Sequence, residues 1–555
     1  MELIKLICPL CNDTVDKLLY RFHYDSERMV IEKIKQEFPQ WTENDGVCLR
    51  CVDFFHSEIV MGQRILPAIG PHFPIKTADD FIVIPTGLRI NADPRYTGKG
   101  ITICFIDSGF YPHPDLVENK NRIRKYVDII NMAEHSKALS FGEDLGDVPS
   151  LWHGTMTTVV CAGDGQLSNG LYKGIASDAE LVLIKVQNAE GHITTENICK
   201  ALQWVIKNHE KYSIRIINMS LGDDVTGSYR ESEVDKLIEQ LIEKGITIVA
   251  AVGNDENGEI KPPANSLNAI AVGGIDDHNR LDYDNIKEYH SSYGTTVDAL
   301  MKPELVAHAI WIAAPILPGT KQQNEAAILY ELFNASDAFL IEKLNKYIQQ
   351  TELDNWLSSE TDLSNIRTAI VQRIQQCKFI SPHYMHVDGT SFAAPIVTAV
   401  IAQLLEANPE LTPQIIREVL FSTSKRIASI LPEKQGYGVI QPRKAILKVL
   451  KRELIMKPNQ SPYINKEKNS IEFYIQNDCA EHISLAGNFN HWAQDVLLLE
   501  PAKNGLWKLE IPLLAEGKYL YKFFIDGKYW MEDVDNPYRE ADGFNGFNSL
   551  LFIQN

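Results

Sequence analysis

Apolar residues between about 85 and 315 form short, nearly continuous runs that are separated by longer amphipathic stretches. Such runs alternating with helices are typical of a parallel sheet that helices cover on both faces. The same pattern resumes at 386 and continues to about 455. The sequence therefore predicts an α/β fold. The expected strands are ITICFID (101–107), ELVLIKV (180–186), IRIINMSL (214–221), ITIVAAVGN (246–254) and AIAVGG (269–274), with helices at 196–209 and 231–244.

Other regions depart from this pattern. Residues 316–385 are rich in Gln, Glu, Leu and Ile, and a spacing near 3.6 predicts two or three amphipathic helices inserted into the α/β domain. Residues 456–469 form a polar, Pro-containing linker. Residues 470–555 carry aromatic and β-branched residues between turn residues, which predicts a small antiparallel β-sandwich. We therefore expect an N-terminal domain over 1–65 and the α/β domain over 66–455.

Composition narrows the class of protein. A chain of 555 residues favours two to four domains. A net charge of -19 disfavours nucleic acid or an anionic membrane surface as a partner. No stretch comes close to the ~20 apolar residues of a membrane span. The start of the chain lacks the features of a signal peptide, so we expect a cytoplasmic protein.

The nine cysteines are odd in number and dispersed, which favours thiols over a disulfide framework. Four of them form two CxxC pairs in the N-terminal region, Cys8, Cys11, Cys48 and Cys51. Four thiolates in this arrangement suit tetrahedral, structural Zn²⁺, with a helix near 27–38 between the pairs. A redox dithiol or a set of reduced thiols is the alternative. The other five cysteines are scattered, mostly in apolar surroundings, and are expected to be buried thiols.

Candidate chemistry centres on Ser391, which precedes an apolar helix in HVDGTSFAAPIVTAVIAQLLE. A serine there is either a helix cap or a nucleophile, and a nucleophile needs a base, an orienting carboxylate and an oxyanion donor. Asp107 ends a strand, His153 begins a helix in LWHGTMTTVVCAGDG, and Asn254 follows a buried strand. Each of these alone fits a cap or a turn equally well.

Together the four contexts resemble the subtilisin-like serine peptidases (subtilases), over roughly 85–455 without the insertion. The matching motifs are Asp107-Ser108-Gly109, His153-Gly154-Thr155, Gly253-Asn254 and Gly389-Thr390-Ser391-Phe392-Ala393-Ala394-Pro395, in family order. The resemblance implies that Ser391 attacks a peptide carbonyl, His153 transfers the proton and Asp107 orients the imidazole. It also implies that Asn254 and the Ser391 N–H hold the oxyanion.

The resemblance further implies that Ser220, Leu221 and Gly222 pair with an extended peptide or an unfolded segment. Asp223 departs from the family, in which a second glycine often stands there. It is either an acidic residue that favours a basic substrate side chain or a surface turn residue. Family members often bind calcium, but no acidic cluster identifies a site here. The insertion is either a helical lid or docking arm, or a peripheral addition.

The C-terminal region resembles the glycogen-binding module of AMP-activated kinase β-subunits and branching enzymes, carbohydrate-binding module family 48. The matches are GNFNHW (487–492), YKFFIDG (521–527), a following tryptophan and FNS (547–549). The resemblance implies that Trp492 and Trp530 stack on sugar rings while Lys522 and Asn548 hydrogen-bond hydroxyls. The extra Tyr529 leaves open which ring faces outward, and a domain used only for packing is the alternative.

The sequence thus predicts an intracellular subtilisin-like serine endopeptidase that acts on peptides or unfolded proteins. Its C-terminal module is expected to localise it to glycogen or another α-glucan. The competing prediction is a latent or non-catalytic scaffold that binds glycogen or a protein partner.

Overall fold

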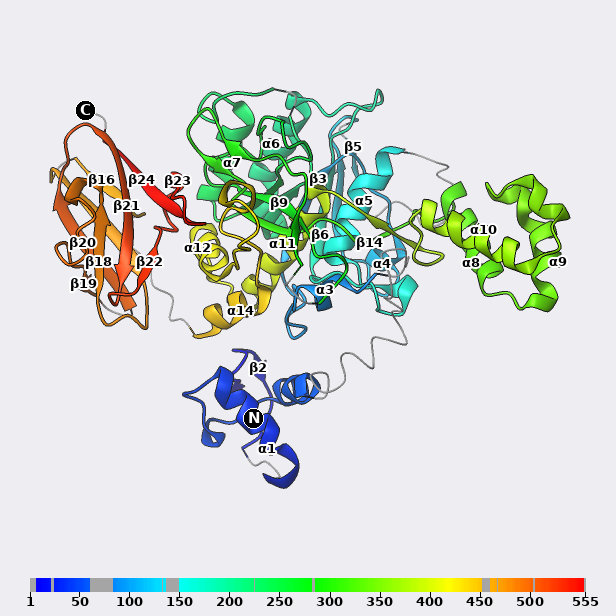
Figure 1. Ribbon diagram of the computed structural model, residues 1–555, viewed down its shortest axis with the longest axis horizontal. Helices are drawn as coiled ribbons and strands as arrows, with labels where there is room; N and C mark the ends of the chain where they lie inside the picture. Colours follow the sequence, from blue (N-terminus) through cyan, green and yellow to red (C-terminus); the bar gives the residue numbers. More distant parts are fainter. Residues whose placement is uncertain are drawn as a thin grey trace.

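The computed structural model describes residues 6–20, 24–59, 83–131, 133–135, 149–223, 225–281, 285–451, 460–466, 468–502 and 505–553. Within these ranges an N-terminal domain, an α/β domain and a C-terminal β-sandwich follow one another along the chain (Figure 1).

A 9-stranded sheet with the order β10-β9-β8-β7-β3-β6-β4-β5, and with β13 beside β9, forms the centre of the α/β domain. Pairing is parallel except at β5 and β10. The parallel sheet predicted from the apolar runs is confirmed. Its strands are β3 (Thr102–Asp107), β4 (Ile123–Asp128), β5 (Ala133–His135), β6 (Glu180–Lys185), β7 (Ile214–Met219), β8 (Thr247–Ala251), β9 (Ile270–Asp276), β10 (Lys287–Glu288) and β13 (Leu305–His308).

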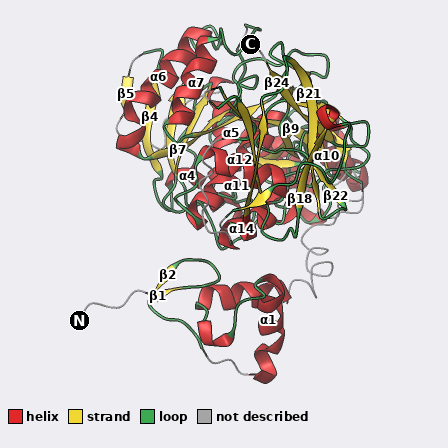
Figure 2. Ribbon diagram, turned by 90° about the vertical axis from the view of Figure 1, so that its left-hand side faces the viewer, coloured by secondary structure: helices red, strands yellow, loops and turns green. Residues whose placement is uncertain are grey.

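Helices cover both faces of this sheet (Figure 2). One face packs in a large buried cluster with α5 and α11, and the other packs with α6 and α7. Thr194 and Ser232 begin α6 and α7 by accepting backbone N–H groups. The helices of the domain are α3 (Thr86–Arg89), α4 (Pro114–Val117), α5 (Pro149–Ala162), α6 (Thr195–Tyr212), α7 (Glu233–Glu243), α11 (Thr390–Ala407), α12 (Pro413–Thr423), α13 (Pro432–Gln435) and α14 (Pro442–Lys451).

Helix α11 corrects one expectation from the sequence. Among the described residues, its 18 residues have a mean hydropathy of 1.4 and are long and apolar enough to cross a membrane. However, 89% of this window is buried inside the protein. The apolar composition of α11 is therefore that of a core helix.

The insertion forms a helical subdomain between β14 (Ile312–Pro315) and β15 (Tyr384–Val387), which pair antiparallel. Its helices α8 (Lys321–Phe333), α9 (Asp337–Tyr347) and α10 (Leu363–Gln376) share a core of their own. Trp152 and Met385 also pack against that core. The insertion therefore touches the residue that precedes His153, although its helices have a separate interior.

In its described residues, the N-terminal domain contains a short hairpin, two α-helices and a 3₁₀ helix, Glu43–Asp45. The hairpin pairs β1 (Leu6–Ile7) with β2 (Thr14–Val15), and the longer helix is α1 (Tyr24–Glu37). A second helix covers 49–59. The helix predicted near 27–38 is thus confirmed as α1, which begins three residues earlier and ends one residue earlier.

The C-terminal sandwich stacks two antiparallel sheets over a core that contains the predicted core residue Trp507. One sheet has the order β16-β17-β20-β19, and the other has β18-β21-β24-β23 with β22 beside β21. The strands are β16 (Tyr463–Asn465), β17 (Ser470–Gln476), β18 (Ile483–Gly487), β19 (Glu500–Pro501), β20 (Leu506–Pro512), β21 (Gly517–Ile525), β22 (Tyr529–Met531), β23 (Arg539–Ala541) and β24 (Phe547–Ile553).

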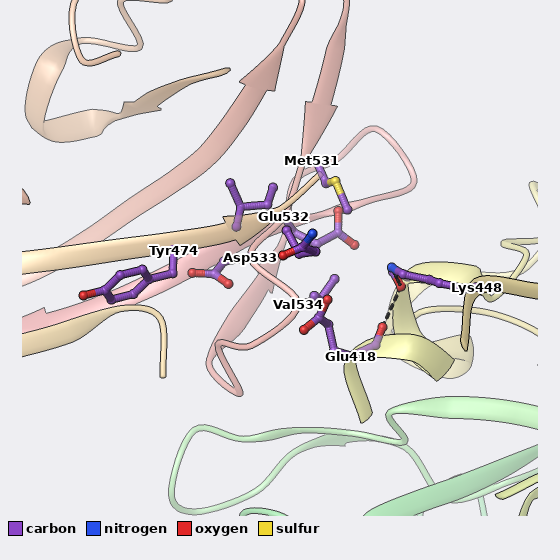
Figure 3. Close-up of a pocket in the computed structure, with 10 residues that line it drawn as sticks. Glu418, Lys448, Tyr474, Met531, Glu532, Asp533 and Val534 are labelled. Carbon is purple, nitrogen blue, oxygen red and sulfur yellow. Dashed lines mark hydrogen bonds between the residues drawn. The ribbon is translucent and has the colours of Figure 1, made fainter. Parts of the chain in front are cut away.

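The sandwich packs directly on the α/β domain. Arg539 donates to the carbonyls of Met301 and Pro303, and its guanidinium lies 4.2 Å from the ring centroid of Tyr437. A cavity of about 10 Å³, room for about one water, remains between the two domains (Figure 3). On its α/β side, Lys448 Nζ donates to Ser422 Oγ over 2.6 Å.

Candidate active site

Asp107 and His153 form a hydrogen-bonded pair at the carboxyl edge of the sheet. Asp107 ends β3 and is 1% exposed, and its Oδ1 lies 2.7 Å from Nδ1 of His153 on α5. Because a carboxylate only accepts, Nδ1 carries the proton and Nε2 is left with a free lone pair. Asp107 is itself fixed by the N–H of Ser108 at 2.6 Å and by the Thr157 hydroxyl at 3.2 Å.

Gly154 allows α5 to approach β3 this closely. A Cβ at this position would lie 2.3 Å from the carbonyl oxygen of Gly109 and 3.1 Å from Cβ of Asp107. The requirement for glycine after His153 is therefore steric. Without it the imidazole could not stay within hydrogen-bond distance of Asp107.

Ser391 is the second residue of α11, and the N-cap is Gly389, whose φ of 136° favours glycine. Ser391 is therefore not the cap. Its neighbour Phe392 has its ring centroid 6.1 Å from that of His153, so the start of α11 lies beside the imidazole. On the other side, the hydroxyl of Ser220 donates to the Ser391 carbonyl at 2.9 Å.

Asn254 reaches the same place from the loop after β8. Its Oδ1 accepts both the backbone N–H and the hydroxyl of Thr390, each at 2.9 Å. These two bonds orient the amide, so that Nδ2 is its free donor. Nδ2 would lie 3.6 Å from a Cβ on Gly389, next to the nucleophile's own turn. Asn254 is thus a preorganised side-chain donor beside Ser391.

The electrostatics of the pair suit a general base. The Asp107 carboxylate raises the pKa of His153 above its usual value, against the opposing effect of burial. The His153 side chain keeps 39% of its surface exposed, which leaves the ring open on one side. The arrangement can accept a proton from a hydroxyl and stabilise the imidazolium that results.

The segment after β7 lies beside the nucleophile. Ser220 and Leu221 are buried, whereas Gly222 is exposed, with open space where a side chain would stand. Asp223 differs from the surface turn residue considered above, because it is 3% exposed and accepts the Thr195 hydroxyl at 2.5 Å. Its carboxylate is therefore bound by the start of α6.

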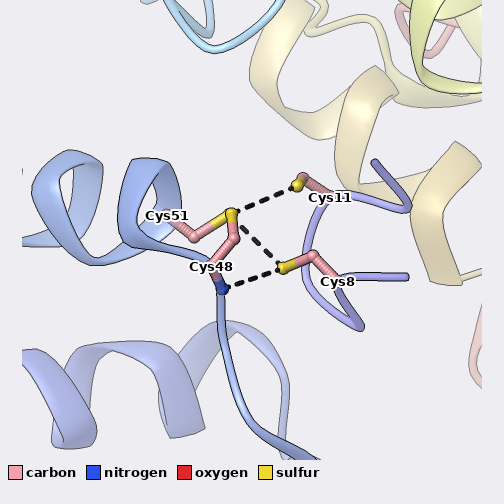
Figure 4. Close-up of side chains that lie close together, drawn as sticks. All are labelled: Cys8, Cys11, Cys48 and Cys51. Atoms are coloured by element: carbon pink, nitrogen blue, oxygen red, sulfur yellow. Dashed lines mark hydrogen bonds between the residues drawn. The ribbon is translucent and has the colours of Figure 1, made fainter. Parts of the chain in front are cut away.

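The four N-terminal cysteines converge in one buried cluster (Figure 4). Their Sγ atoms lie within 4.8 Å of one another, and the pairs Cys8–Cys51 and Cys11–Cys48 are 4.0 and 3.8 Å apart. Tetrahedral thiolates at ~2.3 Å from Zn²⁺ stand about 3.8 Å apart, so the donor set fits this ion. All nine cysteines are free, but Cys377 is only partly buried and Cys479 is exposed, which corrects the expectation of buried thiols.

The outer face of the sheet that contains β21 gathers the predicted sugar-binding residues. Trp530 pairs with Phe524 across the sheet and is 41% exposed, and its ring centroid lies 6.0 Å from that of Trp492. Lys522 lies on this face, bonded to Asp542, and Asn548 on β24 pairs with Glu540. The inserted Tyr529 is 66% exposed, and Trp530 is the ring beside Trp492.

Sequence reasoning missed the residues that hold the pair and the amide in place. Thr157 stands four residues after His153, one helical turn away on the same face, and that spacing was a usable signal. Thr390 orients Asn254 from 136 residues away in sequence. Only the fold brings these two together.

Two parts of the chain match known protein families. Residues 98–438, more than half of the chain, match the Subtilase family, and residues 461–539 match carbohydrate-binding module 48, the isoamylase N-terminal domain. Serine protease AprX of Bacillus subtilis is 28% identical over 359 residues, which cover 63% of this chain and 67% of AprX. Subtilisin Savinase of Lederbergia lenta is 30% identical over 39% of this chain and 70% of its own length.

The chain spans only 21% of another relative, minor extracellular protease Vpr of Bacillus subtilis, at 30% identity over 33% of this chain. Among solved structures, fervidolysin from Fervidobacterium pennivorans overlaps with a TM-score of 0.45 and 17% identity, covering 77% of this chain and 52% of that chain. The family match over 98–438 spans all four catalytic motifs. The chain belongs to the subtilase family of serine peptidases.

Proposed function

We propose that this chain is an intracellular serine endopeptidase in which Ser391 is the nucleophile, His153 the general base and acid, and Asp107 the orienting carboxylate. The observation that carries the proposal is the 2.7 Å bond between His153 Nδ1 and Asp107 Oδ1. It leaves Nε2 as the proton acceptor on a half-exposed ring beside α11. The hydroxyl proton passes to Nε2 as Ser391 attacks the carbonyl, and returns to the leaving amine.

The oxyanion of the tetrahedral intermediate is bound by Nδ2 of Asn254 and the backbone N–H of Ser391. The two bonds from Thr390 support this role, because they fix the amide before substrate arrives. The substrate is an extended peptide that pairs with Ser220, Leu221 and Gly222. Open space at Gly222 supports this placement, since a neighbouring backbone can approach there.

Fluorophosphonate labelling of the full chain tests the proposal. We expect one covalent adduct on the wild type and none on Ser391→Ala. Ser358→Ala, at an exposed serine of the insertion, is the matched control and keeps the label. A wild-type chain that takes no label, although it is folded, would favour the non-catalytic scaffold.

We also propose that the C-terminal domain binds α-glucan through Trp492, Trp530, Lys522 and Asn548. The two neighbouring indoles, one of them 41% exposed, support this role. In native gels cast with glycogen, we expect Trp492→Ala and Trp530→Ala to migrate faster than the wild type. Trp356→Ala, at an exposed tryptophan of the insertion, should be retarded like the wild type. Equal mobility of all variants would contradict glycan binding.

The cysteine cluster is proposed as a structural Zn²⁺ site, with the four thiolates as ligands. The support is the buried donor set, whose spacing fits the ion. We expect one zinc per chain by elemental analysis of the purified protein. Cys11→Ser, which removes one ligand, should lower this content.

A further inference from the structure

The segment 93–99 lies between the cysteine cluster and the core of the peptidase domain. On one side, the Tyr96 hydroxyl donates to the Cys11 carbonyl at 3.1 Å. Arg95 Nη1 lies 3.7 Å from Sγ of Cys51. Two neighbouring residues of the peptidase domain thus contact both CxxC motifs directly.

Arg95 is placed to respond to the charge of this cluster. Its side chain is 1% exposed and forms a forked ion pair with Asp93, with contacts of 2.5 to 3.1 Å. Its guanidinium also lies 4.2 Å from the ring centroid of Phe54. Four thiolates around one Zn²⁺ carry a formal charge of about −2, which attracts the guanidinium of Arg95 in addition to its partner Asp93. A bound metal would therefore strengthen the hold on Arg95.

The other side of the segment is bound to the helix that begins at the nucleophile. Gln403 Nε2 donates to the carbonyls of Asp93 and Tyr96 at 2.8 and 2.6 Å. Oε2 of Glu406 accepts three successive backbone N–H groups, those of Thr97, Gly98 and Lys99, at 2.6, 2.8 and 3.2 Å. Gln403 and Glu406 both lie in the last turns of α11, and Ser391 is the second residue of this helix.

The contact between the two domains is apolar in part, because buried residues of the N-terminal domain and of the peptidase domain belong to one continuous cluster. A groove of about 800 Å³ separates much of their facing surfaces. Outside 93–99, Arg443 of α14 bonds Glu37 and Glu58 at 2.7 and 2.5 Å. The peptidase domain thus presents Arg443 to two glutamates and Arg95 to a cysteine of the cluster.

We propose that the metal centre holds the segment 93–99 in place and, through it, the C-terminal half of α11. We call this connection the clasp. Metal content of the N-terminal domain then controls the rigidity of the helix that carries Ser391. This inference rests on the proposed zinc site. It adds that the ion acts on the peptidase domain and not only on its own fold.

Hydrogen exchange on the full chain tests the clasp, in a Ser391→Ala background that prevents self-cleavage. Zinc is removed with EDTA and restored with zinc chloride. We expect exchange of the Thr97, Gly98 and Lys99 amides to be at least about 10-fold faster without zinc. Arg95→Gln should exchange quickly at these amides even with zinc, and zinc removal should change it no further.

Two controls make the result specific. Arg443→Gln removes a domain contact that does not touch the cysteines. In this variant, zinc removal should still accelerate exchange of the Thr97, Gly98 and Lys99 amides. Arg95→Lys keeps the cation, and its zinc dependence should be intermediate. Unchanged protection of the amides in β3, β6 and β7 verifies that the peptidase domain of each variant is folded.

The possible failures are distinguishable. If zinc binds one per chain and its removal accelerates exchange only within 6–59, the clasp is overturned while the metal site stands. If the purified chain binds no zinc, the metal site fails, and the clasp fails with it.

Discussion

Replacement of Gly154 by alanine tests the steric basis of the catalytic pair. The new Cβ would stand 2.3 Å from the Gly109 carbonyl oxygen and 2.9 Å from Cε1 of Phe110. Real Cβ atoms essentially never come within 3.0 Å of another heavy atom, so α5 and β3 must separate by at least about 0.7 Å. The oxygen belongs to backbone beside the catalytic aspartate, which cannot rotate away as a side chain could.

Two opposing effects set the magnitude. Alanine favours a helix over glycine by about 1 kcal/mol, whereas overpacking of a buried contact costs about 1–3 kcal/mol. We therefore expect a net loss of up to about 2 kcal/mol in the free energy of unfolding. The larger effect falls on turnover, because His153 and Asp107 belong to the two elements that are forced apart. Misplacement by about 1 Å lowers kcat about 10²-fold.

The assay is hydrolysis of a chromogenic tetrapeptide anilide, with kcat and KM measured separately and a thermal melt for stability. We expect kcat to fall while KM changes little, since the peptide-binding segment 220–222 is distant in sequence and follows β7, which is neither of the two elements forced apart. Gly87→Ala is the control, because it lies in α3 with nothing within 4 Å of the added Cβ. That variant should keep its kcat. A Gly154→Ala enzyme with wild-type kcat would refute the reasoning.

Three further predictions concern the site and the domain contact. Because Asp107 raises the pKa of His153 and only the neutral imidazole is a base, the acid limb of kcat/KM lies above pH 6.5. The contribution of this pair to stability is full below the unfolded pKa and is lost as pH rises through the folded pKa. Asp107→Asn should move the limb to lower pH and reduce kcat about 10⁴-fold, and a pH–rate profile measures both. Asn254→Ala should lower kcat about 10²–10³-fold in the anilide assay. If this variant reacted with the fluorophosphonate as fast as the wild type, the result would contradict the assigned role of Asn254. Arg539→Ala should destabilise the docked sandwich by roughly 3 kcal/mol and split the calorimetric transition in two, whereas a single unshifted transition would contradict this.

The repeated pattern of apolar runs was sufficient to predict the parallel sheet, because strands buried on both faces need continuous apolar sequence. The pattern of apolar runs did not reveal the order of the strands within the sheet. β3 lies between β6 and β7, although both follow it in the chain by more than 70 residues. That placement brings the ends of β3 and β7 side by side. The motifs could be recognised without it, but their proximity could not be derived.

Asp223 and Cys479 lie in environments that local sequence does not encode. Asp223 follows an apolar strand in a polar loop, and only the packing of α6 over that loop makes it a buried acceptor for Thr195. Cys479 stands in a turn of the sandwich and is exposed, although the other scattered cysteines are mostly buried. In both cases burial depends on which element covers the residue.

The connection between the cysteine cluster and α11 could not be predicted from the sequence. Gln403 and Glu406 are polar residues in an apolar helix, which would ordinarily mark a solvent-facing stripe. Yet Gln403 is 1% exposed and binds residues more than 300 positions away. A buried amide must find partners, and here it finds them in the segment that also holds Arg95 against the thiolates. Polar residues in a core helix are therefore evidence of a docked segment, even where their own sequence context gives no sign of it.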